Sequence, residues 1–279
     1  MRYALVSLLA LLAGCGRTVA PVNEVVAFPG SDRLLNPADA GWDRIPEHVA
    51  KLMPQDLVEP RLLQPSTQEV RVQTVTFGSE IAFRLRWIDK EVNDAPGPTA
   101  FLDGCAVQIP VRIEANPPDP QMGQPGHPVD IVFWRADWQA SVKGRPDTIQ
   151  GLYPNAQVDH YPFQAKSLAP GSPQQQEMAR RYAPAAAVGN RRVGPRESPV
   201  ELLTAEGPGT LVPGQGVAKG QGIRSPDGWT VVISRKRPEG LAPKVRSQVA
   251  FAVWEGSARE VGARKMRTGW IPLAVREGK

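Results

Sequence analysis

Two side chains in this sequence are candidates for chemistry, the thioether of Met122 and the amine of Lys265. Met122 stands in DPQMGQPGHPVDIVFWRADW, and Lys265 stands in GARKMRTGW. A thioether is a soft and weak donor, and an amine is reactive only after it loses its proton. Each residue taken alone also has an ordinary interpretation, because methionine often fills gaps and a lysine among arginines often lies on a solvated rim.

Motifs of the common enzyme classes are missing from the sequence. It contains no GxSxG, no P-loop, no HExxH and no Rossmann fingerprint after a strand. The glycine-rich stretch GQGVAKGQG (214–222) does not precede a helix, and we expect it to form a turn. Paired carboxylates for glycoside hydrolysis cannot be identified either, because no acidic residue stands in an apolar setting.

The cysteines and histidines exclude two kinds of metal centre. No CxxCH occurs, which excludes covalent attachment of haem of the c type, and His48, His127 and His160 are too scattered to predict a zinc site. Cys105 lies in the strand-like stretch LDGCAVQIPV, so we expect a small buried hydrophobic residue rather than a nucleophile.

The charge distribution argues against a nucleic-acid partner. The net charge of +5 comes from 33 basic and 28 acidic residues spread along the whole chain. Nucleic-acid binding would require a clustered basic stripe.

The N-terminus has the pattern of an exported lipoprotein. Arg2 precedes the apolar run ALVSLLALLA, which is shorter than the roughly 20 residues that span a bilayer. The run ends in LAGC, which resembles the bacterial lipobox and implies lipidation of Cys15 and a periplasmic, membrane-anchored protein. The alternative is ordinary cleavage that discards Cys15. We expect residues 1–14 to be the signal peptide and residues 15–40, which lack any sustained period, to be a tether.

Alternating apolar and polar residues predict a mainly β fold for residues 41–279. The stretch 68–89 indicates a hairpin that turns at Gly78 and Ser79, with Arg84 and Arg86 on a solvated face. Further strands are expected in CAVQIPVRIE, VDIVFWRADWQ, WTVVISRKR, QVAFAVWEG and GWIPLAV.

The order of these elements favours an antiparallel β-sandwich with immunoglobulin-like layers, long loops and a few short helices. No βαβ rhythm is present, which argues against a parallel sheet. Residues 143–216 are rich in Pro, Gly, Gln and Asn, and they contain one predicted helix that begins after Ser172 as the N-cap. Such a long connection is typical of functional loops.

Several stretches together resemble one family, the γ subunits of type II dimethyl-sulfoxide-reductase-type molybdoenzymes. These are the b-haem subunits of ethylbenzene dehydrogenase, dimethyl sulfide dehydrogenase, chlorate reductase and selenate reductase. The stretches that carry the resemblance, in order, are IAFRLRWID, DGCAVQIPV, MGQPGHPVDIVFWRADW, GN at 189–190, LLTAEGPGTL, DGWTVVISR and VAFAVWEGSAREVGARKMRTGW.

The resemblance implies one non-covalent haem b in a β-sandwich, with the iron held by Met122 and Lys265. A lysine binds iron only as the free amine, and its deprotonation at pH 7 costs on the order of 4.6 kcal/mol, so such a ligand requires a dry pocket. We expect Lys265 to point into the sandwich, with its neighbours Arg264 and Met266 pointing away. With both axial positions filled, the haem would transfer electrons and catalyse nothing.

Three features depart from the family pattern. Gln121 occupies a position where family members commonly have a second methionine. His127 lies five residues after Met122 in the same loop and is an alternative axial ligand. A lipid anchor is also unusual among these soluble subunits, so a separate membrane-tethered cytochrome is a second possibility.

The sequence therefore predicts a non-catalytic electron-transfer cytochrome b subunit of a periplasmic molybdenum oxidoreductase. It would relay electrons between an iron–sulfur β subunit, beside a molybdenum α subunit, and a periplasmic cytochrome c or another carrier. The alternative is a carbohydrate- or ligand-binding β-sandwich lipoprotein without haem, with Trp134, Trp138 and Trp229 as an exposed sugar platform. A lipoprotein scaffold without a cofactor is a third reading.

Overall fold

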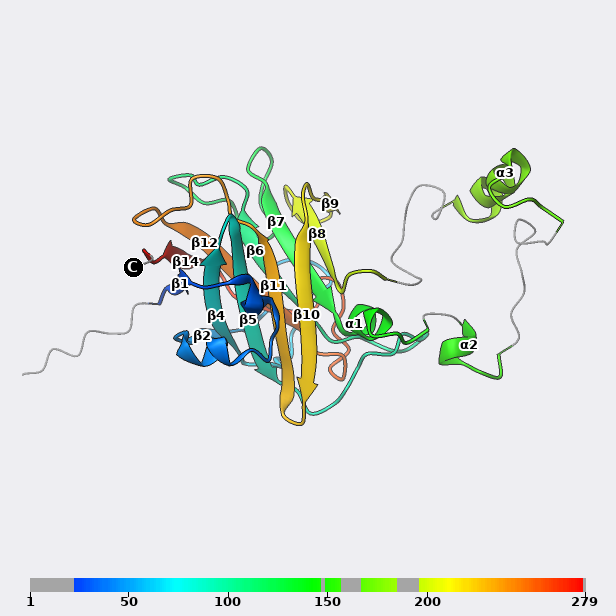
Figure 1. Ribbon diagram of the computed structural model, residues 1–279, viewed down its shortest axis with the longest axis horizontal. Helices are drawn as coiled ribbons and strands as arrows, with labels where there is room; N and C mark the ends of the chain where they lie inside the picture. Colours follow the sequence, from blue (N-terminus) through cyan, green and yellow to red (C-terminus); the bar gives the residue numbers. More distant parts are fainter. Residues whose placement is uncertain (1–22, 147–148, 157–166, 185–195, 278–279) are drawn as a thin grey trace, which may run out of the picture.

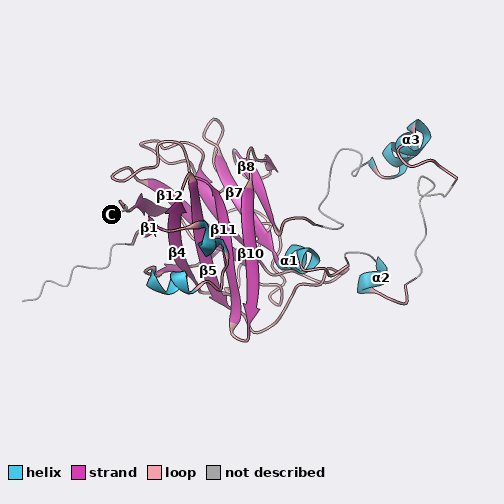
Figure 2. Cartoon of the chain, viewed as in Figure 1, coloured by secondary structure: helices cyan, strands magenta, loops and turns pink. Residues whose placement is uncertain are grey.

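The computed structural model describes residues 23–146, 149–156, 167–184 and 196–277, and strands dominate it (Figures 1 and 2). The predicted signal peptide and Cys15 lie outside the described residues. The strands are β1 Val25–Pro29, β2 His48–Lys51, β3 Met53–Pro54, β4 Glu69–Phe77, β5 Glu80–Ile88, β6 Gly104–Pro110, β7 Val129–Arg135, β8 Val200–Ala205, β9 Val212–Pro213, β10 Ala218–Ser225, β11 Gly228–Lys236, β12 Ser247–Trp254, β13 Met266–Arg267 and β14 Ile271–Val275. The helices are η1 Asp32–Leu35, η2 Ala40–Arg44, α1 Ala136–Val142, α2 Ile149–Leu152 and α3 Pro173–Tyr182.

The strands form two packed layers, as predicted. The first layer has the order β10-β11-β5-β4-β1-β14, and the second has the order β12-β6-β7-β8-β9. Strand β12 belongs to both, because residues 247–249 pair with β14 and residues 250–254 pair with β6. The pairing is antiparallel, as predicted, except at β1, which runs parallel to both β4 and β14.

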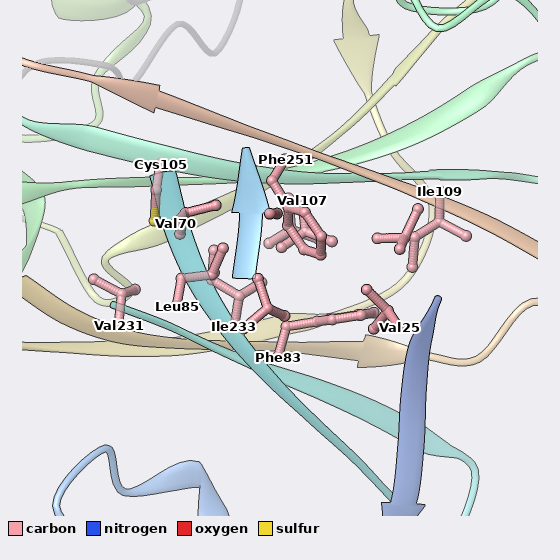
Figure 3. Close-up of a cluster of buried hydrophobic side chains, with 14 of the residues drawn as sticks. Val25, Val70, Phe83, Leu85, Cys105, Val107, Ile109, Val231, Ile233 and Phe251 are labelled. Atoms are coloured by element: carbon pink, nitrogen blue, oxygen red, sulfur yellow. The ribbon is translucent and has the colours of Figure 1, made fainter. Parts of the chain in front are cut away.

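The main hydrophobic core lies between the two layers. Phe83 of β5 and Phe251 of β12 meet edge to face with ring centroids 6.1 Å apart. Figure 3 shows these rings among side chains from both layers. Cys105 is fully buried here, and burial raises the pKa of its thiol, so the predicted role as a small hydrophobic residue is confirmed.

Two locally encoded features match their predictions. Strands β4 and β5 form the expected hairpin around Gly78 and Ser79. Helix α3 begins after Ser172, whose hydroxyl accepts a hydrogen bond from the backbone N–H of Gln175 at 3.3 Å. Each depends on contacts within a few residues.

The predicted tether belongs in part to the folded body. Residues Val25–Pro29 form β1 between β4 and β14, and the side chains of Val25 and Ala27 are buried in the core. The expectation that residues 15–40 form a tether is therefore wrong from Val25 onward. The alternation of β1 is too short to detect in a stretch interrupted by proline.

The expectation of a turn at residues 214–222 fails in part, for a steric reason. The stretch GQGVAKGQG is a turn only in its first part, because β10 begins at Ala218. A Cβ on Gly220 would lie 2.3 Å from Val200 Cγ1, and one on Gly222 would lie 2.4 Å from a ring carbon of Trp134. These glycines therefore allow β10 to pack closely on the second layer.

The face that carries Arg84 is covered rather than solvated. The Arg84 guanidinium lies 5.8 Å from the centre of the ring of Trp42, a fully buried residue of η2, and donates to Gln73 Oε1 at 2.9 Å. The segment around Trp42 therefore packs on the first layer.

Candidate haem-binding cavity

A cavity of about 520 Å³ brings Met122 and Lys265 together. Its floor is the face of the second layer that points away from the main core. The floor side chains come from β6, β7, β8 and β12: Ala106, Gln108, Ile131, Phe133, Leu203 and Ala252. Most of these residues belong to a second hydrophobic cluster, separate from the core between the layers, and Met122 packs against this cluster.

Strand register decides on which face the β13 side chains lie. Met266 pairs with Val253, which belongs to the core between the layers, and Met266 is 1% exposed. Arg267 pairs with Ala252, which belongs to the outer cluster, and Arg267 lines the cavity. Directly paired residues share a face of a sheet, so Met266 points into the sandwich and Arg267 points out of it.

Lys265 follows the alternation and lines the same outer cavity as Arg267. Our expectation that Lys265 points into the sandwich was therefore wrong, although it does point opposite to Met266. The cavity is formed between the second layer and the loops that cover its outer face.

Met122 is held in an unusual backbone conformation. Its φ angle is 72°, in the left-handed region that non-glycine residues seldom adopt. The Met122 carbonyl accepts a hydrogen bond from the Gly207 N–H at 2.8 Å. Gly123 must lack a side chain, because its φ is 82° and a Cβ would lie 2.9 Å from the carbonyl oxygens of Ala205 and His127. Such strain is often retained where a residue serves a site.

The turn that carries Lys265 is held by hydrogen bonds from Gln55 and Trp254. The backbone N–H of Gln55 donates to the Lys265 carbonyl at 2.9 Å, and Gln55 Nε2 donates to the Ala263 carbonyl at 3.1 Å. The Trp254 indole N–H donates to the Gly262 carbonyl at 3.0 Å. These contacts fix the backbone from which the amine projects.

The cavity favours the neutral form of Lys265. Burial, and secondarily the nearby charge of Arg267, lowers the pKa of the amine from 10.5 to about 8. At this pKa, deprotonation at pH 7 costs about 1 kcal/mol, well below the cost for an exposed lysine. The amine is still mainly protonated at pH 7, but its neutral, metal-binding form is far more accessible than that of an exposed lysine.

A second basic side chain in the cavity is already neutralised. Arg135 lines the cavity and donates to both carboxylate oxygens of Asp137, at 2.9 and 2.6 Å. Its guanidinium also stacks 4.7 Å from the centre of the Trp138 ring.

His127 does not line the cavity. Its Nδ1 lies 2.5 Å from Glu114 Oε2, so this nitrogen is hydrogen bonded to a carboxylate. The structure therefore does not favour His127 as the alternative ligand.

The three tryptophans considered as a sugar platform are buried: Trp134 is 0% exposed, Trp138 1% and Trp229 5%. The prediction of a platform at these residues was therefore wrong, because these rings pack against neighbouring rings or cationic side chains.

Sequence reasoning missed Gln55 and Arg267 in the cavity wall. Strand alternation could have indicated Arg267, which is two residues after Lys265 and so on the same face. No local signal indicated Gln55, which comes from the other end of the chain.

Three buried carboxylates form a cluster near the base of the loops that carry cavity residues. Oxygens of Asp89, Asp103 and Glu255 lie within 4.8 Å of one another. The Gly256 N–H and the Trp229 indole N–H each donate to Asp103 at 3.0 Å. Burial, and then the charges of Asp103 and Glu255, raises the pKa of Asp89 to about 7. This cluster had no sequence signal.

Among the described residues, no helix is long and apolar enough to cross a bilayer.

A protein-family model described as "Ethylbenzene dehydrogenase" matches residues 39–266. The chain is 26% identical over 278 residues to the "Putative respiratory nitrate reductase heme subunit ORF7" of Haloferax mediterranei, covering 95% of this chain and 79% of that protein. It is 25% identical over 261 residues to the "Chlorate reductase subunit gamma" of Ideonella dechloratans, covering 90% and 84%. A solved family 9 carbohydrate binding module from Caldicellulosiruptor kristjanssonii, in complex with glucose, aligns with 91% of this chain and 96% of its own at 8% identity. The TM-score of this alignment is 0.40.

Proposed function

This chain belongs to the ethylbenzene dehydrogenase family, and from that premise we propose that it is an electron-transfer cytochrome subunit with one non-covalent haem b. Met122 Sδ and Lys265 Nζ would hold the haem iron. The observation that carries the proposal is that these two residues, far apart in sequence, line one cavity. The names of the two relatives, a heme subunit and a γ subunit, support the same assignment.

The cavity fits such a cofactor in size and in chemistry. Its volume of about 520 Å³ lies within the range of about 300–1,000 Å³ that is typical of cofactor sites. The floor is mainly apolar, as a porphyrin face requires. Of the two donors, the thioether is never charged and the amine has a lowered pKa, so neither must remain a buried cation.

The residues of this chain set the function of the site. A haem would supply one-electron chemistry when bound. Met122 and Lys265 come from two separate loops, and both would donate to the iron. The arrangement therefore supports electron transfer without catalysis by this chain.

We propose that the partners are a molybdenum α subunit and an iron–sulfur β subunit, with a periplasmic cytochrome c or another carrier as the second redox partner. The support is that the two relatives are named as parts of a nitrate reductase and a chlorate reductase. A separate membrane-tethered cytochrome would require the same site.

We further propose that the protein is exported and anchored to a membrane by lipid on Cys15. The support is the LAGC stretch after a short apolar run. Replacing Cys15 with Ser should move the protein from the membrane fraction to the soluble fraction. Retention of the variant in membranes would contradict the anchor.

The test of the haem assignment is purification of the protein made with ample haem. The expected product is red, with a low-spin Soret band and a haem that acid-acetone extracts, because nothing attaches it covalently. A colourless protein that shows no Soret shift on titration with haemin would refute the proposal.

A further inference from the structure

The cavity contains a guanidinium, that of Arg267, for which the described residues provide no hydrogen-bond partner. Arg267 lines the cavity, and its side chain is 12% exposed. Its Nε is buried with no hydrogen-bond acceptor in the described part of the chain. Its nearest carboxylate is that of Asp56, whose Oδ1 lies 3.7 Å away, beyond hydrogen-bond distance.

The Asp56 contact does little to neutralise Arg267. The Asp56 side chain is 61% exposed, so solvent screens the pair strongly. A buried cation with unsatisfied donors is unfavourable, and native proteins seldom retain one without a reason.

Arg135 provides the contrast within the same cavity. Two nitrogens of its guanidinium donate to the two carboxylate oxygens of Asp137, so its charge is already neutralised. Arg267 has its planar donors free, and a guanidinium binds a carboxylate most strongly when two parallel N–H groups donate to it. The geometry therefore selects Arg267 as the anion-binding group of this cavity.

We propose that Arg267 binds a propionate carboxylate of the haem. This inference rests on the proposed function and assigns a role to a residue other than the two proposed iron donors. In this role Arg267 would bind a haem propionate, and Lys265 on the same face would bind the haem iron.

The test compares haemin with its dimethyl ester, in which both propionates are neutral. Both probes are titrated into the haem-free protein and followed by Soret absorption. The wild-type protein should bind haemin more tightly than the ester. Arg267→Gln should lower haemin affinity about tenfold, or about 1.4 kcal/mol, and leave the affinity for the ester unchanged, because only the charged carboxylate is recognised.

Two control variants separate this role from general effects. Arg264→Gln removes a guanidinium from the same hairpin that stacks on Phe101 at 5.9 Å and does not line the cavity, so it should preserve the preference for haemin. Arg135→Gln should have a smaller effect on the preference than Arg267→Gln.

Thermal unfolding of the haem-free protein gives an independent readout. Arg267→Gln should leave the melting temperature unchanged or raise it, because it removes a buried cation without a partner. A purely structural role for Arg267 would instead lower the melting temperature.

Distinct outcomes would overturn the inference. If Arg267→Gln weakens both probes equally, or neither, or if Arg135→Gln rather than Arg267→Gln abolishes the preference, Arg267 does not bind the propionate. If the wild-type protein binds neither probe, the proposed function itself fails.

Discussion

The amine nitrogen of Lys265 lies 5.1 Å from the centre of the Trp254 ring, and the Trp254 indole N–H is bonded to the Gly262 carbonyl in the turn before Lys265. The Trp254 side chain of β12 therefore forms the cavity wall beside the amine and also fixes the turn that precedes Lys265. An ammonium group over an indole face is favourable, so this arrangement suits the lysine when it is protonated as well.

Lys265→Ala should remove one axial donor. We expect loss or a shift of the low-spin Soret band and at least about tenfold weaker haem binding, because a metal–ligand bond is lost while the apolar floor remains. Absorption spectroscopy of the purified variant provides the measurement. Lys236→Ala, at an exposed position of β11, is the matched control and should leave the spectrum unchanged. An unchanged spectrum for Lys265→Ala would remove Lys265 from the iron.

Met122→Leu should separate packing from ligation. Leucine is close to methionine in volume and can pack against the same cluster, so the free energy of unfolding should change by less than about 1.5 kcal/mol. It has no sulfur donor, and we therefore expect the low-spin spectrum to be lost. Denaturation of the haem-free variant and its haem-bound spectrum are the two measurements. A low-spin spectrum identical to that of the wild-type protein would exclude Met122 as a ligand.

Asp89→Asn should reduce the pH dependence of stability. Asp89 has its pKa raised from 3.8 to about 7, so between these values the folded protein binds more protons than the unfolded chain. The stabilisation of the folded state by the proton on Asp89 is fully present below pH 4 and is lost as the pH rises towards 7. At pH 8 the variant, which keeps the shape without the charge, should be more stable than wild type by on the order of 2 kcal/mol.

Denaturant unfolding at pH 5 and pH 8 measures this effect. Asp227→Asn, at an exposed turn position, is the control and should follow the wild-type profile. A steeper loss of stability at pH 8 in Asp89→Asn than in wild type would show that the Asp89 carboxylate is stabilising as an anion.

Gly222→Ala should destabilise the contact between the layers. The added Cβ would lie 2.4 Å from a ring carbon of fully buried Trp134, so the ring or β10 must move, at a cost of about 1–3 kcal/mol. Thermal unfolding measures the loss. Gly269→Ala is the control, since a Cβ there meets nothing within 4 Å, and it should be neutral or slightly stabilising. Equal melting temperatures for the two variants would contradict the proposed packing.

The features that were predictable from sequence are those with local causes. The hairpin at Gly78 and the cap at Ser172 follow from turn and capping chemistry within a few residues. Strand β10 was not predictable, because its glycines break the apolar alternation. It is extended because it pairs with β11 along its length and because Gly220 and Gly222 fit against the second layer.

The sequence by itself determined the sandwich class and the family, it singled out Met122 and Lys265 as candidate donors, and its alternation placed Lys265 opposite to Met266. Tertiary structure decided which of the two faces is the core. The pairing of Met266 with Val253 turns Met266 inward, so Lys265 and Arg267 project into the cavity on the outer face. A period of two separates the faces of a strand, but only the packing of the second layer identifies the face that is covered.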